Sequence, residues 1–170
     1  MGQKALSRLR FNFGFLLEAT LGESRVTELD YPTIRVSEDV TLTPLQGQIE
    51  ATRTSEGIYI AGVLHSAIEL ECVRCLTPFL HPITFEIGDL FYYPPHTAPP
   101  GEFVIAETGF VDLAPLVREL SLLEIPMHAL CKEDCLGLCQ ECGQNLNEGD
   151  CSCEEDNSDP RFAILGKLLD

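Results

Sequence analysis

The sequence has few basic residues and no long hydrophobic run. Each of these absences excludes a class of function. Only 11 Lys and Arg stand against 27 Asp and Glu, so the formal net charge of the 170 residues is -16. Such a surface disfavours general electrostatic binding to nucleic acid or to an anionic membrane. Any such contact has to be local, or the partner itself has to be basic. No apolar run approaches the roughly 18 residues that a membrane helix needs, which predicts a soluble protein without membrane contact.

A recognisable secretion signal is missing as well. Basic residues near the start precede a short apolar stretch, residues 13–17, but Glu18 ends it and no small-residue cleavage site follows. We therefore expect a cytoplasmic protein, whose eight cysteines face a reducing environment. Under those conditions clustered cysteines bind metal more often than they pair as disulfides.

The first part of the chain has the composition of an antiparallel β-sheet. β-Branched and aromatic residues dominate three extended runs, 46–53, 58–71 and 79–91. Turn-forming residues at 54–57 separate the first two runs and predict a hairpin in which Gly57 takes a positive φ. Several strands joined by such short turns predict an antiparallel sheet of barrel- or sandwich-like form.

Helices are predicted after a proline-rich loop. Residues 93–101 include several prolines, which have no backbone N–H to donate to a neighbouring strand. This segment therefore cannot continue the sheet. Asp112 then predicts the N-cap of a helix that ends before Pro126, and Asp159 with Pro160 predicts the start of a last short helix. The apolar face predicted for the first of these helices comprises Leu113, Leu116, Val117, Leu120 and Leu123.

The change in composition predicts an α+β protein in two parts. Residues 1–100 are expected to form a β-rich domain that carries the first cysteine pair. Residues 101–170 are expected to form a helix and a cysteine-rich, zinc-binding module that packs on the first part as one unit. A chain of 170 residues is long enough to bury a real core in either arrangement.

The strongest chemical signal is the spacing of the cysteines, six of which lie within 23 residues. A two-residue gap, as in Cys139-x2-Cys142, lets two thiolates face one ion from a single turn. Gly143 directly after it suits the tight turn. Eight ligands divide naturally into two tetrahedral sites. The compact set is Cys139, Cys142, Cys151 and Cys153; the other is Cys72, Cys75, Cys131 and Cys135, which would clip the sheet to the C-terminal module.

Zinc is the expected metal, as two structural ions or as one. Sites made of four thiolates are usually closed and lack catalysis. Free core cysteines, disulfides and an iron–sulfur cluster are the alternatives, the last because Cys135-x3-Cys139-x2-Cys142 has the spacing used by radical enzymes. His128, just before Cys131, could replace one thiolate, although a surface or capping histidine is the simpler interpretation.

Sequence patterns of catalysis are missing. The chain has no nucleophile elbow, phosphate loop or zinc-protease helix. The acidic run at 154–156 has no matching pattern of general acid and base and is expected to be a solvated loop. We therefore predict a protein that is not an enzyme and has no small-molecule substrate.

An ordered series of motifs resembles the YceD family of bacteria and plastids, named for large ribosomal RNA subunit accumulation. The motifs are ECVRCL at 71–76, LCxxxCLGLCxxCGxNLN at 130–147, CxC at 151–153 and DPRxxxL at 159–165. The resemblance implies a non-enzymatic ribosome biogenesis factor needed for accumulation of large-subunit (23S) ribosomal RNA. It would bind either the RNA precursor or a basic ribosomal protein of that subunit. Some members lack most of the C-terminal cysteines, which implies a stabilising role for these residues.

Charge favours the basic ribosomal protein as the partner. Binding to RNA would require a local cluster of basic side chains. Four arginines could form such a cluster only if folding brings them together. Arg74, between two metal-binding cysteines, is the candidate RNA contact, but it could equally bond a backbone carbonyl or the thiolate shell. An iron–sulfur or thiol-redox protein is the alternative function, and it lacks the βαβ context that would support it. The four arginines considered above for an RNA contact are Arg8, Arg10, Arg53 and Arg74.

Overall fold

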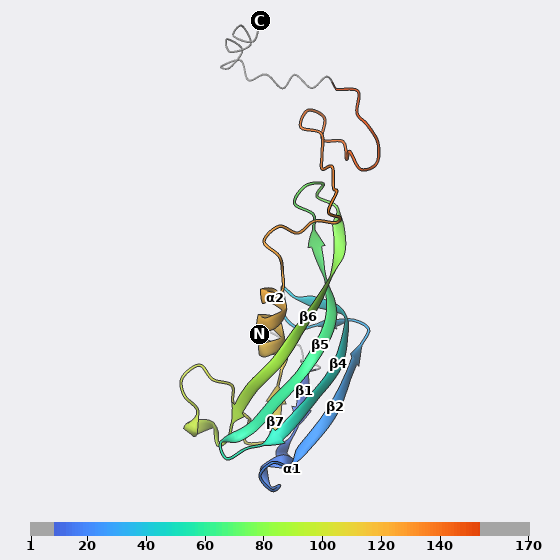
Figure 1. Ribbon diagram of the computed structural model, residues 1–170. Helices are drawn as coiled ribbons and strands as arrows, with labels where there is room; N and C mark the ends of the chain where they lie inside the picture. Colours follow the sequence, from blue (N-terminus) through green and yellow to red (C-terminus); the bar gives the residue numbers. More distant parts are fainter. Residues whose placement is uncertain (1–8, 154–170) are drawn as a thin grey trace, which may run out of the picture.

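The computed structural model describes residues 9–153 and is built on one antiparallel β-sheet (Figure 1). The strands of this sheet follow the order β2–β4–β5–β6, with the short β3 also paired to β4. All of these pairs are antiparallel, as the sequence predicts. Strands β2 and β6 lie at the two ends of the order, so the sheet is open within the described residues. The strand bounds are Ser24–Tyr31 (β2), Ile34–Arg35 (β3), Thr41–Arg53 (β4), Gly57–Glu71 (β5) and Pro78–Tyr92 (β6).

A small second sheet and two short helices complete the fold. Strands β1 (Arg10–Asn12) and β7 (Phe110–Asp112) pair antiparallel, and α1 spans Gly14–Leu17. The proline-rich loop forms only a 3-10 turn at Pro95–Thr97. Helix α2 (Ala114–Leu123) packs against β6. No helix in residues 9–153 is long and apolar enough to cross a membrane.

Helix α2 ends before Pro126, as predicted, but its N-cap residue and the exposure of Leu123 differ from the prediction. It starts at Ala114, whose N–H donates to Asp112 Oδ1 at 3.0 Å, so Asp112 supports the start from one position before the N-cap residue. Leu123, predicted on the buried face, is 78% exposed. The chain leaves the helix in a tight turn, in which Ile125 N donates to Leu122 O at 3.3 Å. At this end of the helix, Leu122 and Ile125 pack against the core.

One hydrophobic core lies on a single face of the large sheet. Period-2 alternation along β5 sends every second side chain inward and leaves the others exposed. Residues from both predicted parts of the chain share this core, although the division at residue 100 itself stays a prediction. Core members include Ile49, Ile60, Leu64 and Phe85 from the sheet, and Ile105, Leu113 and Val117 from the segment that follows.

The hairpin between β4 and β5 forms as predicted, but the prediction for Gly57 is wrong. Thr54 N donates to Gly57 O at 2.9 Å and closes the turn. Gly57 does not have a positive φ. A Cβ atom at this position would lie 2.0 Å from Phe91 O on the neighbouring strand. Glycine is therefore required for the close approach of β6 and not for a left-handed turn.

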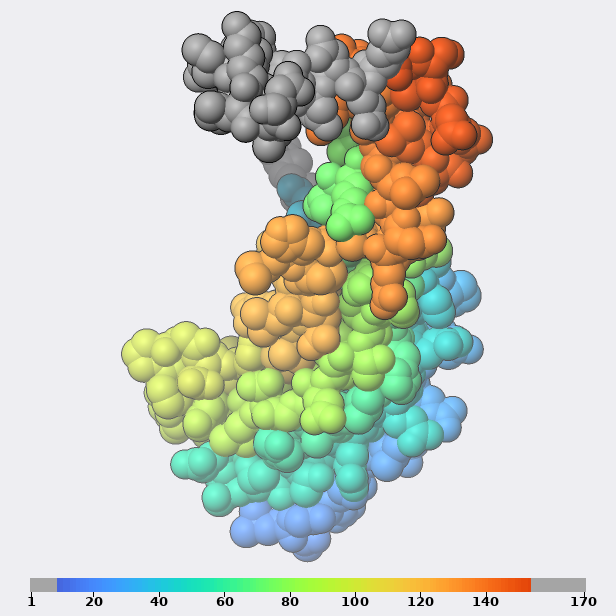
Figure 2. All heavy atoms as spheres, turned by 45° about the horizontal axis from the view of Figure 1, so that its top comes forward, coloured from blue at the N-terminus to red at the C-terminus, as the bar shows by residue number. Residues whose placement is uncertain are grey.

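The far end of the β5–β6 hairpin extends beyond the core and carries the C-terminal segment. Figures 1 and 2 show the dark orange residues that follow α2 lying over the green hairpin tip, away from the main body of the sheet. The first cysteine pair, Cys72 and Cys75, occupies the turn between the two strands. The helix predicted at Asp159 and Pro160 and the acidic run at 154–156 lie outside the described residues.

Close strand packing predicts different costs for two glycine substitutions in the sheet. A Cβ at Gly62 would lie 2.2 Å from Gln48 O, whereas at Gly88 it would meet only Tyr59 Oη at 3.2 Å. We expect Gly62→Ala to lower the free energy of unfolding by about 2 kcal/mol or more, because β4 and β5 must separate. Gly88→Ala should cost under about 1 kcal/mol, because a tyrosine side chain can move. Urea unfolding of both variants tests this, and equal losses would contradict it.

Candidate metal centres

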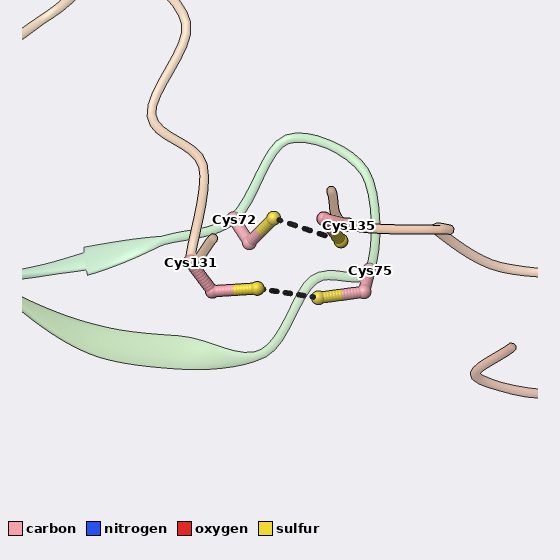
Figure 3. A group of neighbouring side chains, drawn as sticks. All are labelled: Cys72, Cys75, Cys131 and Cys135. Atoms are coloured by element: carbon pink, nitrogen blue, oxygen red, sulfur yellow. Dashed lines mark hydrogen bonds between the residues drawn. The ribbon is translucent and has the colours of Figure 1, made fainter. Parts of the chain in front are cut away.

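Four cysteine sulfurs meet where the β5–β6 turn contacts the C-terminal segment (Figure 3). We call this group, Cys72, Cys75, Cys131 and Cys135, the first centre; its Sγ atoms all lie within 4.8 Å of one another. The Sγ atoms of Cys72 and Cys135 are 3.8 Å apart, and those of Cys75 and Cys131 are 3.6 Å apart. Sulfurs bound tetrahedrally to zinc at about 2.3 Å are about 3.8 Å apart, whereas a disulfide bond is about 2.05 Å long. The first centre thus fits a four-thiolate metal site.

The remaining cysteines form a second group of the same kind. Cys139, Cys142, Cys151 and Cys153 also place their sulfurs within 4.8 Å of one another, and we call them the second centre. The two groups are the ones that the cysteine spacing predicts. They differ in burial: three cysteines of the first centre are buried, whereas in the second centre Cys142 is exposed and the others are half-buried. The second centre is therefore the more accessible to solvent.

Both centres use the same backbone turn after a Cys-x2-Cys pair. In the first, Leu76 N donates to Cys72 O at 2.9 Å; in the second, Gly143 N donates to Cys139 O at 3.0 Å. Leu76 has φ 58° and Gly143 has φ 73°. Glycine adopts this left-handed conformation freely, which suits the tight turn expected at Gly143, but leucine does so at a cost of order 1 kcal/mol. The turn at Leu76 is thus held by its surroundings, and no sequence pattern predicted it.

Hydrogen bonds lower the pKa of some of the thiols in each centre. Burial opposes ionisation of Cys72, but backbone N–H groups of Cys131, Cys75 and Arg74 donate to its sulfur and lower its pKa to about 6. In the second centre, the N–H groups of Cys142 and Glu141 lower the pKa of Cys139 to about 7. The side-chain hydroxyl and the backbone N–H of Thr77 likewise lower the pKa of Cys75. These three sulfurs form thiolates more readily than an ordinary cysteine does.

Other thiols of the same centres resist ionisation. Desolvation and the neighbouring sulfur of Cys75 raise the pKa of Cys131 to about 12. In the second centre, the sulfur of Cys142 and burial raise the pKa of Cys153 to about 12. Gathered thiolates repel one another, and a bound cation removes this repulsion. The thiol chemistry of both groups therefore fits a divalent metal.

A loop of the second centre supports the first centre directly. Asn147 lies between Cys142 and Cys151, yet its Nδ2 donates to Cys135 Sγ at 3.4 Å. Its Oδ1 accepts from Leu136 N at 3.0 Å. The same loop binds at a second point, where Asn145 Nδ2 donates to Thr77 Oγ1 at 3.4 Å. Neither asparagine was predicted to have a role, although the Asn-Leu-Asn motif between the cysteines was an available signal.

Arg74 bonds a backbone carbonyl, which was one of the two structural roles considered for it from the sequence. Its Nη1 donates to Cys135 O at 2.9 Å, which ties the β5–β6 turn to the C-terminal segment. An RNA contact of Arg74 stays a prediction. His128 is exposed and belongs to neither sulfur group in the described residues. Four thiols thus complete the first centre without it.

The described arginines named as candidates do not gather into one basic spot. Arg53 donates to Gly57 O at the start of β5, whereas Arg74 lies just past its other end. A 15-residue strand separates them by about 45 Å. Arg10, on β1, lies over the ring of Phe110 instead. Arg8 lies outside the described residues.

Loss of one cysteine is expected to empty one centre only. Cys72→Ser should remove the metal of the first centre and lower thermal stability strongly, because a structural metal contributes on the order of 10 kcal/mol to folding. Cys139→Ser should remove the metal of the second centre and leave unfolding of the sheet nearly unchanged. Elemental analysis and thermal unfolding test this. Val73→Ser, an exposed neighbour of Cys72, is the control. Retention of both metals by Cys72→Ser would show the grouping to be wrong.

Asn147→Asp is expected to weaken metal retention at the first centre. Aspartate keeps the acceptor for Leu136 N but lacks the donor to Cys135 Sγ and adds a negative charge beside the thiolates. We expect about tenfold faster release of the first-centre metal to a chelator. The measurement is best made with the second centre intact, because that centre holds the loop that carries Asn147, and the slower phase of metal release is assigned to the buried first centre. Gln140→Ala, an exposed residue of the same segment, should release metal at the unaltered rate. Equal rates for all three proteins would rule out the role of Asn147.

Comparison with known proteins finds relatives in bacteria and plants. An uncharacterized protein of Mycobacterium tuberculosis is 32% identical over 121 residues, which cover 68% of this chain and 57% of the relative. The uncharacterized protein YlbN of Bacillus subtilis is 29% identical over 163 residues, 91% of this chain and 88% of YlbN. The chain thus spans under two thirds of the length of the mycobacterial relative but most of the length of YlbN. No solved structure matches the chain significantly.

Some of the matching proteins, and the matching family, have a name that concerns ribosomal RNA. A chloroplastic protein of Arabidopsis thaliana, named large ribosomal RNA subunit accumulation protein YCED homolog 1, is 25% identical over 79% of this chain and 53% of its own length. The family described as large ribosomal RNA subunit accumulation protein YceD matches residues 60–169, from β5 through both metal centres. This chain therefore belongs to the YceD family.

Proposed function

We propose that this protein is a non-enzymatic, cytoplasmic assembly factor needed for large-subunit ribosomal RNA to accumulate. The observation that carries the proposal is the YceD match over residues 60–169, since that family is named for this RNA. The Arabidopsis relative has the same name. All eight cysteines lie in the two sulfur groups, so metal binding at both groups would occupy every thiol of the chain.

The eight cysteines are proposed as ligands of two structural zinc ions. Zinc favours tetrahedral sulfur ligation, and sulfur separations of 3.6 and 3.8 Å in the first centre suit it. Four thiolates fill the coordination shell and leave no position for a reacting water. The role proposed for the metal is to hold the hairpin tip and the C-terminal segment together. Elemental analysis of the unaltered protein tests this choice, because an iron-containing sample would contradict it.

The direct partner that we propose is a basic protein of the large subunit. The net charge of -16 repels RNA and attracts Lys- and Arg-rich chains. Two zinc ions with eight thiolates would change this charge by +4 and -8, to about -20. The distance between Arg53 and Arg74, at opposite ends of β5, gives no support to a single RNA-binding patch.

Depletion of the protein from its host tests the proposed function. We expect the ratio of large- to small-subunit ribosomal RNA to fall, and a plasmid copy of the unaltered gene to restore it. Total RNA analysis and sucrose-gradient profiles of ribosomal subunits measure the effect. The Cys72→Ser variant should restore the ratio poorly and the Val73→Ser control fully. An unchanged ratio on full depletion would refute the proposal.

A further inference from the structure

The outer face of the large sheet, opposite the core, is exposed and acidic. On this face, alternate residues of β2, β4, β5 and β6 point to solvent, and nothing in residues 9–153 covers them. The positions of this face hold no Lys or Arg. Its carboxylates are Glu28, Asp30, Glu50, Glu69, Glu71 and Glu86.

Strand register places small side chains in the middle of this face and larger ones around them. In one row across the sheet, Val26 pairs with Glu50, Glu50 with Ala61, and Ala61 with Gly88. The next row runs from Glu28 through Gln48 and Val63 to Glu86. The small residues leave an open hollow of about 510 Å³, whose lining includes Val26, Glu50, Ala61, Val63 and His65.

Apolar side chains are exposed within this acidic surround. Val26 is 51% exposed and Val63 is 42% exposed. An exposed apolar floor with a charged rim is the composition of a protein-binding surface.

The carboxylates of the rim differ in their partners. Gln48 Nε2 donates to Glu28 at 3.1 Å, which orients that side chain. Glu50 and Glu86 take part in no ion pair in the part of the chain that the structure describes, where the pair recorded is Arg118 with Asp39. Two carboxylates beside the hollow therefore lack a countercharge from the described residues.

We propose that the outer sheet face is the docking surface for a Lys- and Arg-rich protein segment. Its apolar side chains lie on Val26 and Val63, and its cations face Glu50 and Glu86. Charge complementarity selects this occupant, because the phosphates of RNA would meet carboxylates without a single Lys or Arg on the face. This inference depends on the proposed function in one respect only, which is that the bound segment is part of a ribosomal protein.

Charge reversal on the face tests the docking surface. The probe is a fluorescent peptide in which Lys and Arg alternate with Val and Leu, added to the full-length, metal-loaded protein. We expect Glu50→Lys/Glu86→Lys to weaken peptide binding by roughly tenfold or more. The matched control, Glu102→Lys/Glu107→Lys, makes the same change in net charge at exposed positions off the sheet and should bind within about twofold of the unaltered protein. Binding should weaken as salt rises.

A second variant tests the apolar floor without altering charge. Val63→Thr keeps a β-branched side chain in β5 but replaces a methyl group with a hydroxyl, and we expect binding to weaken about threefold. Metal content and thermal unfolding of every variant should match the unaltered protein. Equal weakening by both charge-reversal variants would mean that only net charge matters and would overturn the docking surface. So would tighter binding of a single-stranded ribosomal RNA fragment than of the peptide.

The same variants separate this inference from the proposed function. In cells depleted of the native protein, Glu50→Lys/Glu86→Lys should fail to restore large-subunit ribosomal RNA, whereas Glu102→Lys/Glu107→Lys should restore it. If depletion lowers this RNA but both variants restore it fully, the docking surface is wrong and the proposed function stands. If depletion has no effect while peptide binding follows the expected order, the surface stands and the ribosomal function fails.

Discussion

The end of the molecule that carries both centres depends on the convergence of four sulfurs from segments far apart in the chain. Cys75 and Cys131 are separated by 56 positions, and Cys72 and Cys135 by 63. Around them the buried cluster consists of three cysteines, with only partly buried apolar residues packed against it. So small a cluster cannot offset the entropy of closing a loop of this length. Metal–thiolate bonds would supply the stabilisation that a hydrophobic core supplies elsewhere in the fold.

The two centres are not equivalent, because the second is attached to the sheet through the first. The first is buried and joins the hairpin tip to the C-terminal segment, with Arg74 adding a bond to Cys135 O. The second is more exposed and reaches the sheet through the first, by way of Asn147 and the bond from Leu146 N to Gly137 O. Disruption of the second centre therefore loosens a support of the first, whereas disruption of the first detaches both from the hairpin.

Local patterns predicted much of this structure, and long-range contacts account for what they missed. Cysteine spacing predicted both sulfur groups, and alternation predicted β4, β5 and β6, because ligand geometry and strand pleat repeat at short range. Gly57 was misjudged because the carbonyl that excludes a side chain there belongs to Phe91, on another strand. The support from Asn147 to Cys135 was equally hidden, since it joins two different cysteine groups. The hollow on the outer face required the register of four strands, which no single segment contains.

The two sulfur groups and the acidic sheet face lie in different parts of the fold, and these parts are suited to different roles. A structural metal with four thiolates is rigid and closed, so the metal end is suited to holding shape and not to exchanging partners. The outer face is a different kind of surface, because its carboxylates stand on paired strands whose register is set by the buried face. A flexible acidic tail would have to lose conformational entropy on binding a basic chain, whereas side chains on a fixed sheet lose much less. A partner of high positive charge could therefore be held with its contacts in a defined register, which diffuse attraction by the net charge alone cannot provide.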